Sequence, residues 1–556
     1  MNNITLYILI GFLLSFSSCK VNSSLQVNDN NRTQYHIDKT TIAGEIHCFV
    51  PIYPVLRSKE NNPVSRINIR TTGENSPSSI DGFKVDLSRT FDLSDIKEVK
   101  VFYTAKEENF SIEKEFGKST EISKRLLISG QQDLLLGENN FWLSLTLNES
   151  ADLLNKVSAS ITAIKTGKQY KAISGSPEYP LQRTGIALRK HNDRGVDTYR
   201  IPGLATTNSG TLIAVYDIRR NSAVDLQEDI DVGMNRSTDG GQTWEPMRII
   251  MDMGEWGDLP NEQNGIGDPA VLVDRHTNTI WVAAVWAHGH PGKRNWWASK
   301  QGMTPAETSQ FVLVKSEDDG KTWSAPINIT SQIKDPGWHL LLQGPGKGIT
   351  LKDGTLVFPA QFKDENEMPH STLIYSKDQG QCWHIGTGAK SNTTEAQIVE
   401  LSDGALMLNM RDNRGSGPTG RNGKGARSVA TTNDLGKTWV EHPTSMKALP
   451  EPVCMASLIR HDYTVGGQRK SILIFSNPFD QYTRQNMTIK VSEDEGMTWQ
   501  EKYFTLIDEG RGRGYSCLTS IDENTIGILY EGSQADLVFQ KISLQELMQN
   551  NSKSRE

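Results

Sequence analysis

The stretch Ser316-Glu-Asp-Asp-Gly-Lys-Thr-Trp323 follows an alternating apolar run at residues 311–315. The Asp side chain of such an octet can accept hydrogen bonds from the backbone of a turn, Gly supplies a positive φ, and Trp covers the base of a hairpin. The octet therefore predicts the tip of a β-hairpin. Further copies with the same spacing begin at Ser237, Ser376, Thr432 and Ser492.

The five octets recur at intervals that indicate a repeating unit. Their aspartates are separated by 79, 60, 56 and 60 residues, at Asp239, Asp318, Asp378, Asp434 and Asp494. A repeated unit of this size is typical of a propeller, a solenoid or an array. Interleaved with the octets are six segments with a strand, a polar turn and a second strand, at residues 203–216, 268–286, 346–359, 395–410, 455–475 and 515–530. Six repeats of four-stranded sheet predict an all-β fold with a six-bladed β-propeller.

The order of strands within a blade predicts where functional residues gather. If the first strand of each blade begins at an upper face, the second strand ends there, and the octet turns lie on the lower face. Residues just before a first strand or just after a second strand are therefore expected to meet on the upper face, around the axis.

The first residues and the charge of the chain bear on its location and partners. The 556 residues carry a net charge of −7 at pH 7, which argues against nucleic acid as a main partner. The apolar run at residues 4–16 is too short to span a bilayer and indicates a signal peptide at residues 1–18. Phe16-Ser-Ser-Cys19 resembles a bacterial lipoprotein processing site, so we expect a lipid anchor at Cys19 and a periplasmic, outer-membrane or cell-surface location. The alternative is ordinary signal-peptide cleavage with an incidental cysteine.

The region before the octets has a pattern of its own. Residues 19–44 are polar and indicate a tether, and residues 45–171 alternate without any octet, which predicts a separate β-sandwich. Its expected strands include residues 65–72, 97–104, 141–147 and 157–164. Residues 172–180 are then a linker, residues 181–545 the propeller, and residues 546–556 a frayed tail.

Two sets of potential metal ligands are interpreted as structural. The four cysteines after Cys19 have neither disulfide nor metal spacing, which favours small buried residues; they are Cys48, Cys382, Cys454 and Cys517. His288-Gly-His290 lacks a third ligand, which favours a surface loop over a zinc site.

Three arginines occupy equivalent upper-face positions in three blades. Arg200 precedes the first strand of blade one, and Arg411 and Arg484 follow the second strands of blades four and five. Each arginine alone is compatible with a solvated surface position. Three guanidinium groups that converge on one axis repel each other unless they bind an anion, and their planar forks suit a carboxylate.

Carboxylates and one tyrosine share this placement. Asp217 and Asp225 flank Arg219 after blade one, and the other residues at strand ends are Asp268, Glu395, Tyr515 and Glu531. The alternatives are structural: Glu531 as a buried carboxylate that holds Arg200, and Tyr515 as a core aromatic residue. Gln343 precedes the glycine-rich Gly344-Pro-Gly-Lys-Gly348 and is a further candidate ligand contact. A long insertion of blade two contains three tryptophans, Trp286, Trp296 and Trp297. They either line the substrate site or have only a packing role in the fold.

Several of these motifs resemble those of bacterial exo-α-sialidases (neuraminidases) with Asp-box repeats, of the type found in gut and oral Bacteroides-like bacteria. They are Tyr199-Arg-Ile-Pro202, the five octets, Thr394-Glu-Ala-Gln-Ile-Val-Glu400 and Tyr515-Ser-Cys-Leu518. The likeness covers residues 181–539, in the order of the family. The region before the linker resembles the carbohydrate-binding β-sandwich that precedes the propeller in some sialidases.

The resemblance implies a retaining exo-α-sialidase that removes terminal α-linked sialic acid from glycoproteins and glycolipids. It further implies a monomer without cofactor or metal. Tyr515 would be the nucleophile, Glu395 would take its proton, and Asp225 would act as acid and base. The resemblance also assigns substrate contacts: the sialic acid carboxylate to Arg200, Arg411 and Arg484, the 4-hydroxyl to Arg219 and Asp268, and the orientation of Arg200 to Glu531.

A tyrosine nucleophile, the known sialidase exception among retaining glycosidases, has a physical reason. The anomeric carbon of sialic acid carries a carboxylate, against which an anionic Asp or Glu would approach, whereas a phenol approaches as a neutral group. Two other functions stay open. A trans-sialidase shares every catalytic residue, and a non-catalytic Asp-box propeller would bind sialic acid without needing Asp225 or the Tyr515–Glu395 pair.

Overall fold

The structure is a computed structural model, and it describes residues 34–36, 44–72, 79–173, 180–225, 228–289, 293–417 and 420–549. The predicted signal peptide, Cys19, most of the tether, residues 174–179 of the linker, His290 and residues 550–556 of the tail lie outside the described residues. Within these ranges, no helix combines the length and the apolar content that crossing a membrane requires.

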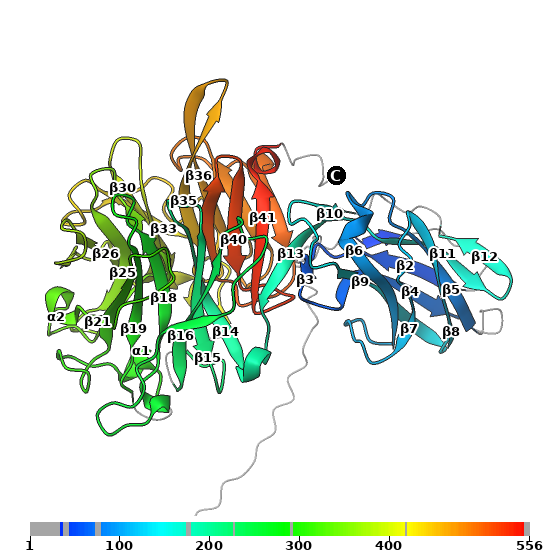
Figure 1. The fold of residues 1–556 in the computed structure, drawn as a ribbon, viewed down its shortest axis with the longest axis horizontal. Coiled ribbons are helices and arrows are strands. Elements are labelled where there is room, and N and C mark those ends of the chain that lie inside the picture. Colours follow the sequence, from blue (N-terminus) through cyan, green and yellow to red (C-terminus); the bar gives the residue numbers. More distant parts are fainter. Residues whose placement is uncertain are drawn as a thin grey trace, which may run out of the picture.

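Figure 1 shows two parts built almost wholly from strands, a sandwich and a propeller. The sandwich has two sheets. The first runs β1 (Gln34–His36), β2 (Gly44–Phe49), β4 (Asn62–Thr71), β9 (Gly137–Leu147), β6 (Ile96–Ala105), β7 (Glu115–Ser119). The second runs β12 (Gln169–Ala172), β11 (Ser160–Thr166), β5 (Ser79–Asp86), β8 (Arg125–Asp133). Fully buried side chains such as Phe83 and Phe141 fill the space between the sheets.

Six further sheets form the blades of the propeller. Blade one consists of β14 (Thr198–Thr206), β15 (Leu212–Arg219), β16 (Ile230–Ser237) and β17 (Arg248–Met251). Blade two consists of β18 (Ile266–Val273), β19 (Ile280–Trp286), β20 (Gln310–Ser316) and β21 (Ile327–Asn328). Blade three consists of β22 (Leu340–Gln343), β24 (Ile349–Thr350), β25 (Leu356–Lys363), β26 (Pro369–Ser376), β27 (His384–Ile385) and β28 (Lys390–Ser391). The short β23 (Gly346–Lys347) pairs with β18.

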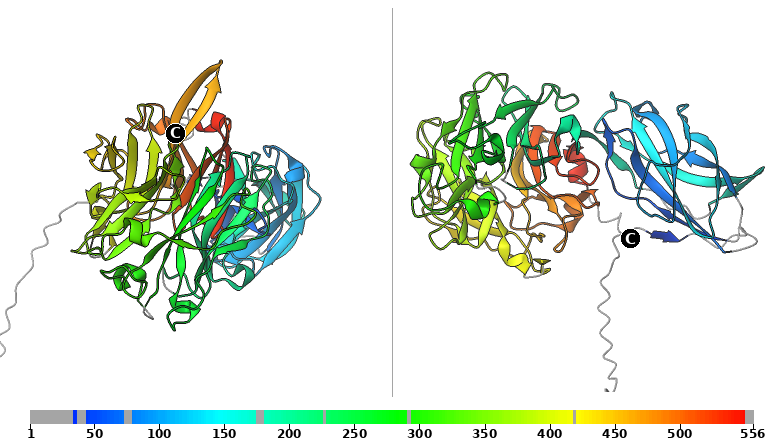
Figure 2. Two further views of the ribbon diagram at one scale, coloured as in Figure 1. Left: turned by 60° about the vertical axis from the view of Figure 1, so that its left-hand side comes forward. Right: turned by 90° about the horizontal axis from the view of Figure 1, so that it is seen from below.

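The other three blades follow in chain order. They are β29 (Thr393–Glu400), β30 (Leu406–Asp412), β33 (Ser428–Thr432), β34 (Val440–Glu441); β35 (Ser457–Val465), β36 (Gln468–Pro478), β37 (Met487–Ser492), β38 (Phe504–Asp508); and β39 (Ser516–Asp522), β40 (Thr525–Tyr530), β41 (Leu537–Ser543), β13 (Gln182–Arg189). One strand of each blade contacts a strand of the next blade in turn around the axis, from β14 through β18, β25, β29 and β35 to β39, which contacts β14 again. Figure 2 shows the blades from two further sides.

Blade six explains why six blades carry only five octets. Each octet joins the third and fourth strands of a blade, as between β20 and β21. In blade six the fourth strand is β13, which comes from the start of the propeller and pairs antiparallel with β41. No chain connection exists there for an octet to make.

The octets form the predicted turns. In the second copy, Asp318 accepts the Thr322 N–H at 2.8 Å and the Thr322 hydroxyl at 2.6 Å, while the Ser316 hydroxyl accepts the Gly320 N–H at 2.9 Å. Asp319 and Gly320 both have positive φ, at 63° and 81°. The third copy has Cys382 at the threonine position, and this cysteine is exposed. The prediction that all four cysteines are buried is therefore wrong for Cys382, because its side chain points from a turn into solvent.

The sandwich is less separate from the propeller than its sequence pattern suggests. β3 (Val55–Arg57) pairs parallel, and β10 (Lys156–Val157) antiparallel, with β13 of blade six. The predicted strand at 157–164 is therefore divided, since β10 joins blade six and β11 stays in the sandwich. Leu56 and Leu153, both from the N-terminal part, belong to hydrophobic clusters of the propeller. Helix α3 (Leu544–Leu547) adds Glu546, which pairs with Arg183 and Lys156.

Candidate active site

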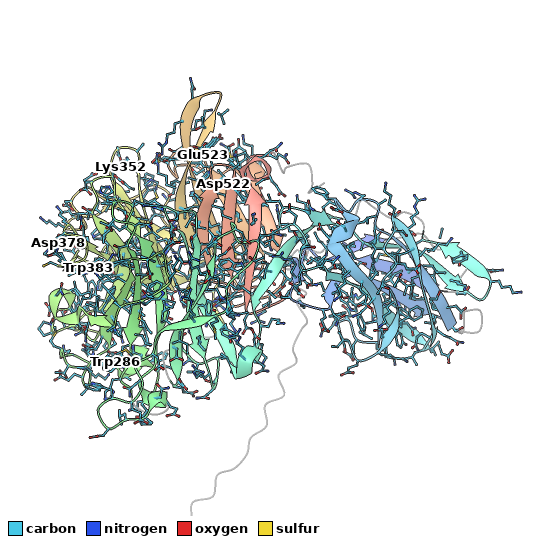
Figure 3. The ribbon with its side chains drawn as sticks, viewed as in Figure 1. Trp286, Lys352, Asp378, Trp383, Asp522 and Glu523 are labelled. Atoms are coloured by element: carbon cyan, nitrogen blue, oxygen red, sulfur yellow. The ribbon has the colours of Figure 1, made fainter. Side chains whose placement is uncertain are left out.

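Five of the residues that the sequence places on the upper face as site candidates line one pocket of about 310 Å³. Its walls include Asp225, Asp268, Glu395, Arg411 and Tyr515, which come from blades one, two, four and six. The remaining lining residues are Arg294, Trp296, Trp297, Leu342, Gln361, Thr394 and Asn413. Helix α1 (Asn295–Ala298) lies at this end of the propeller (Figure 1), and so does Trp286, which Figure 3 labels.

Tyr515 and Glu395 are directly hydrogen bonded although 120 residues separate them. The Tyr515 hydroxyl donates to Glu395 Oε1 and lies 3.1 Å from Arg411 Nη1. The same Arg411 nitrogen donates to Glu395 Oε2 at 2.5 Å. Burial, and after it the charge of Glu395, raises the pKa of Tyr515 well above its usual value, so the phenol is protonated at neutral pH and has an acceptor for its proton.

The three predicted arginines surround this tyrosine. The guanidinium carbons of Arg200 and Arg484 lie 5.2 and 5.5 Å from the centre of its ring, and Arg411 contacts its hydroxyl. The Nε atoms of Arg411 and Arg484 are buried without a hydrogen-bond partner in the described protein. Three convergent cations with unused donors form a site for an anion.

Glu531 holds Arg200 in a two-pronged pair. Its carboxylate accepts Arg200 Nε at 2.8 Å and Nη2 at 3.1 Å, and it also accepts the backbone N–H groups of Ile201 and Tyr515, both at 3.0 Å. Burial opposes ionisation, but Arg200 outweighs it and lowers the pKa of Glu531. The carboxylate is thus charged, buried and fully hydrogen bonded, which fixes Arg200 beside Tyr515.

A second charged cluster lies on the blade-one side of the pocket. Arg219 is fully buried and donates to Asp217 at 3.0 and 2.8 Å, while its Nη2 lies 2.6 Å from Asp225 and 3.8 Å from Asp268. Asp225 has a side chain that is 48% exposed, and Arg200 lies 4.0 Å from it. Asp225 is therefore the carboxylate of this cluster that solvent and substrate can reach.

The pKa values in this cluster diverge. Burial alone would raise the pKa of Asp225, but Arg219 and Arg200 hold it well below its ordinary value. Burial raises the pKa of Asp217 to about 6, against the attraction of Arg219. Burial, then the charges of Asp225 and Asp217, raise the pKa of Asp268 well above the usual range. Closely placed carboxylates with such different proton affinities are typical of acid–base sites.

Gln343 and the three tryptophans differ in whether they reach the pocket. Gln343 is fully buried and its side-chain amide donates to the backbone carbonyl of Asp268, so it supports the Asp268 turn from behind. Trp286 is buried between blades, whereas Trp296 and Trp297 line the pocket. Trp297 is 58% exposed at the rim.

Sequence reasoning assigned no role to some residues that build the site. Asp217 fixes Arg219 and also accepts the Asp268 N–H at 2.8 Å. Its spacing of two residues from Arg219 on one strand puts both on the same face, a signal that the sequence contains. Leu342, Gln361 and Thr394 form another wall, and the Gln361 Oε1 and Thr394 Oγ1 atoms lack protein partners. Only the packing of blades three and four brings these three together.

Side chains of the types that ligate metals occur throughout the described residues. Among them no group of three or more His, Cys, Asp and Glu side chains is arranged to hold a metal ion. His288 bonds Asn264 Oδ1 at 2.8 Å and contacts the rings of Trp256 and Trp286 edge-on. It is part of an aromatic cluster next to the pocket.

The propeller and the cluster of arginines around a tyrosine–glutamate pair place the chain in the class of β-propeller enzymes that act on anionic substrates. Two protein-family models match it: "BNR repeat-like domain" over residues 210–528 and "N-terminal domain of BNR-repeat neuraminidase" over residues 43–170. A sialidase of Bacteroides fragilis is 51% identical over 441 residues, which cover 79% of each chain. The chain therefore belongs to the bacterial sialidase family.

Two solved structures extend this comparison. Hadza microbial sialidase Hz136 is 43% identical, with a TM-score of 0.83, over 90% of this chain and 99% of that one. The intramolecular trans-sialidase from Ruminococcus gnavus is 20% identical, with a TM-score of 0.51, over 64% of this chain and 96% of that one. The second likeness shows the shared fold alone.

Proposed function

We propose that this chain is a retaining exo-α-sialidase that cleaves terminal sialic acids from glycoconjugates through a tyrosyl intermediate. Family membership supports sialidase activity, and the hydrogen-bonded set of Tyr515, Glu395 and Arg411 carries the mechanistic part of the proposal. A residue with a merely structural role would not need a carboxylate and a guanidinium group at its hydroxyl inside a substrate-sized pocket.

Substrate binding begins at the arginines. The carboxylate of sialic acid would take the donors of Arg200, Arg411 and Arg484, which places the anomeric carbon near the Tyr515 hydroxyl. Arg200 is held rigid by Glu531, so little conformational entropy is lost when it binds. Asp268 lines the pocket and would bind the 4-hydroxyl, and the fully buried Arg219 lies behind it.

In the first chemical step the Tyr515 oxygen attacks the anomeric carbon while its proton passes to Glu395. The bond from the anomeric carbon to the leaving oxygen breaks, and Asp225 gives that oxygen a proton. In the second step Asp225 takes a proton from water and the water oxygen attacks the same carbon. The bond from that carbon to the Tyr515 oxygen breaks, and Tyr515 regains its proton from Glu395. Two inversions at one carbon give net retention.

Asp225 must gain a proton before the first step, although its arginine neighbours keep it ionised in the free protein. A bound substrate carboxylate cancels part of the positive charge of Arg200 and displaces water from the pocket. Both changes raise the proton affinity of Asp225. Substrate binding therefore prepares the acid.

The first test traps the intermediate. A 2,3-difluoro analogue of sialic acid reacts through departure of fluoride, and its second fluorine slows the following hydrolysis. Intact-mass analysis should show one sialosyl adduct on the wild type and none on Tyr515→Phe, with peptide mapping to Tyr515. Tyr515→Phe should also lose activity on sialyllactose by several powers of ten, about the 10⁴-fold scale of catalytic groups. An adduct on another residue, or more than about a tenth of the activity retained in a folded variant, contradicts the nucleophile assignment.

A second measurement separates hydrolysis from transfer. Proton NMR of sialyllactose cleavage should show the α-anomer of free sialic acid first, as retention requires. With added isotope-labelled lactose as acceptor, a hydrolase gives the same product, and a trans-sialidase gives labelled sialyllactose. Binding without turnover would leave the substrate spectrum unchanged.

We further propose that the protein is monomeric and is attached to the outer membrane or cell surface through Cys19, on the strength of Phe16-Ser-Ser-Cys19. Metabolic labelling with a radioactive fatty acid should label the wild type and not Cys19→Ala. Equal labelling of both would place the lipid elsewhere.

A further inference from the structure

A second cavity lies on the propeller axis at the end opposite the catalytic pocket. It has a volume of about 270 Å³. Every blade contributes to it from the strand nearest the axis, through Ala205, Val273, Lys347, Val399, Leu458 and Thr519. Lys352 also lines it and lies toward the opposite end of the propeller from Trp286 (Figure 3). The sialidase mechanism uses none of these residues.

The cavity has more positive than negative side chains. Four cations line it, two from turns and two from strands: Arg275, Lys347, Lys352 and Arg460. Only two carboxylates line it, Glu400 and Asp462. Both are already engaged, because Lys352 lies 3.8 Å from Glu400 and Arg460 lies 3.4 Å from Asp462. Two positive charges, those of Lys347 and Arg275, remain.

Lys347 lacks a compensating charge in the described part of the chain. The two side chains that act on it electrostatically are the Cys517 thiol and the Arg275 guanidinium. Burial raises the pKa of Cys517 to about 11, so the thiol is neutral. Burial lowers the pKa of Lys347 to about 8; Cys517 acts in the opposite direction, and the positive charge of Arg275 adds a smaller lowering. Arg275 itself donates Nη1 to the neutral Asn208 Oδ1 at 3.1 Å.

Lys347 is partly buried and Arg275 is exposed, and both line this cavity. Two like charges that share a cavity repel each other, which costs free energy unless a counter-ion lies between them. An anion between Lys347 and Arg275 would relieve that cost. A volume near 270 Å³ accommodates a phosphate-sized ion together with several waters, since one water occupies about 30 Å³ in the liquid.

We propose that this axial cavity binds a small oxyanion, such as inorganic phosphate, between Lys347 and Arg275. The site is separate from the carboxylate-binding arginines at the other end of the propeller. It links the inner strands of blades two and three with that of blade six, so an occupied site stabilises the ring.

The test uses the full chain with its catalytic pocket saturated by 2-deoxy-2,3-didehydro-sialic acid, which prevents phosphate from binding to Arg200, Arg411 and Arg484. Thermal unfolding is followed as phosphate replaces chloride at constant ionic strength. The melting temperature of the wild type should rise with phosphate concentration. Lys347→Met should lose this rise, and calorimetry should show phosphate binding weakened by about tenfold or more, the scale of one charge-assisted hydrogen bond.

The melting temperature in the absence of phosphate provides a second test, in which the variant is expected to be the more stable protein. Without phosphate, Lys347→Met should melt above the wild type, because it removes one of two unpaired cations. The matched control Lys321→Met removes an exposed lysine far from the cavity and should behave like the wild type in both conditions. Should Lys347→Met fail to fold, Arg275→Gln replaces it with the same expectation for phosphate.

Acetate is tested in the same way, because it distinguishes a site that also binds carboxylates from a site that requires a tetrahedral anion. A melting temperature that rises with phosphate alone indicates a phosphate-type site. A melting temperature that rises with both anions indicates a general oxyanion site. Full retention of the rise in Lys347→Met and Arg275→Gln, or no rise in the wild type with either anion, overturns the proposal.

Discussion

Asp225 differs from the carboxylates around it because only its side chain is both half exposed and held by two arginines. Asp217 and Asp268 are buried beside Arg219, and burial raises the pKa of both carboxyl groups. Arg219 and Arg200 instead lower the pKa of Asp225. The three carboxylates of this cluster therefore differ in proton affinity.

The acid role of Asp225 predicts a dependence on the leaving group. Asp225→Ala should slow cleavage of sialyllactose by about 100-fold or more, since an aliphatic alkoxide needs a proton to leave. Cleavage of the methylumbelliferyl sialoside should slow far less, because its phenolate leaves unaided. The two rates are compared in initial-velocity assays on one preparation, so misfolding lowers both equally. Equal losses in a folded variant would leave Asp225 with a binding role only.

At the scale of single elements, the third octet departs from the other four. In those four the threonine hydroxyl donates to the second oxygen of the aspartate, as Thr438 does to Asp434 at 2.7 Å. In the third octet Asp378 receives the Cys382 N–H at 2.9 Å, and a thiol stands where the hydroxyl would be. A thiol is a weaker donor than a hydroxyl.

Replacing this cysteine should therefore complete the turn. Cys382→Thr is expected to raise the melting temperature by about 1 °C, the scale of a fraction of one hydrogen bond in a chain of this size. Cys382→Val has the shape of threonine without the hydroxyl and serves as the control. Differential scanning calorimetry checks both, and an equal rise in Cys382→Val would attribute the gain to shape.

Blade five contains a fully buried lysine. Lys490 donates to Asn477 Oδ1 at 2.6 Å, and its ammonium group lies 4.4 to 5.4 Å from the centres of three rings, those of Phe479, Phe504 and Phe475. Burial lowers the pKa of Lys490 to about 7, whereas an unfolded chain has a lysine pKa of about 10.4. Above pH 7 the folded protein therefore binds fewer protons at this site than the unfolded chain.

This difference sets the sign of a pH effect on stability. Because the unfolded state binds more protons between about pH 7 and 10, the free energy of unfolding should receive a rising contribution from Lys490 over that window. Lys490→Met should remove the contribution, while Lys470→Met, an exposed lysine of the same blade, should keep it. Urea unfolding at pH 7, 8 and 9 measures the slopes. Parallel curves for wild type and Lys490→Met would show that Lys490 does not titrate there.

At the scale of the whole molecule, the N-terminal part supports the blade that closes the ring. β3 and β10 flank β13, and Arg57 reaches the Glu149 and Ala151 backbone carbonyls and also that of Gln242 in the first octet. Blade six has no octet to hold β13 to β41. The strands from the sandwich side hold it instead.

A core residue of the N-terminal part should therefore stabilise the catalytic propeller. Leu56→Ala, at a fully buried site in a propeller cluster, should lower the free energy of unfolding by about 2–5 kcal/mol. The denaturant midpoint of sialidase activity should fall accordingly. Leu136→Ala, whose wild-type side chain is 74% exposed in the sandwich, is the control. An unchanged activity midpoint in Leu56→Ala would mean that the propeller folds independently.

The same contacts change what is expected from truncation. A chain that begins at Pro180 keeps β13 and its pairing with β41 but loses β3 and β10. We expect such a chain to keep its turnover of a small sialoside at low temperature and to inactivate at a lower temperature than the full chain. The sequence pattern by itself predicted a β-sandwich separate from the propeller.

The sequence by itself determined the octet turns, the number of blades and the face on which charged residues gather. These features depend on residues close together in the chain, such as Ser316, Asp318 and Thr322, whose hydrogen bonds close within one turn. Strand alternation likewise assigns faces over two residues. Such local rules do not depend on the fold of the rest of the chain.

Tertiary structure alone decided the closure of blade six, the junction with the sandwich and the pairing of charges. Arg200 and Glu531 are separated by 331 residues, and Tyr515 and Glu395 by 120. No local pattern states which of several carboxylates meets which arginine, or that Gln343 supports Asp268 from behind. These partners are fixed by the ring of blades, because the geometry of closure sets which strand ends become neighbours and burial then requires each charge among them to be paired.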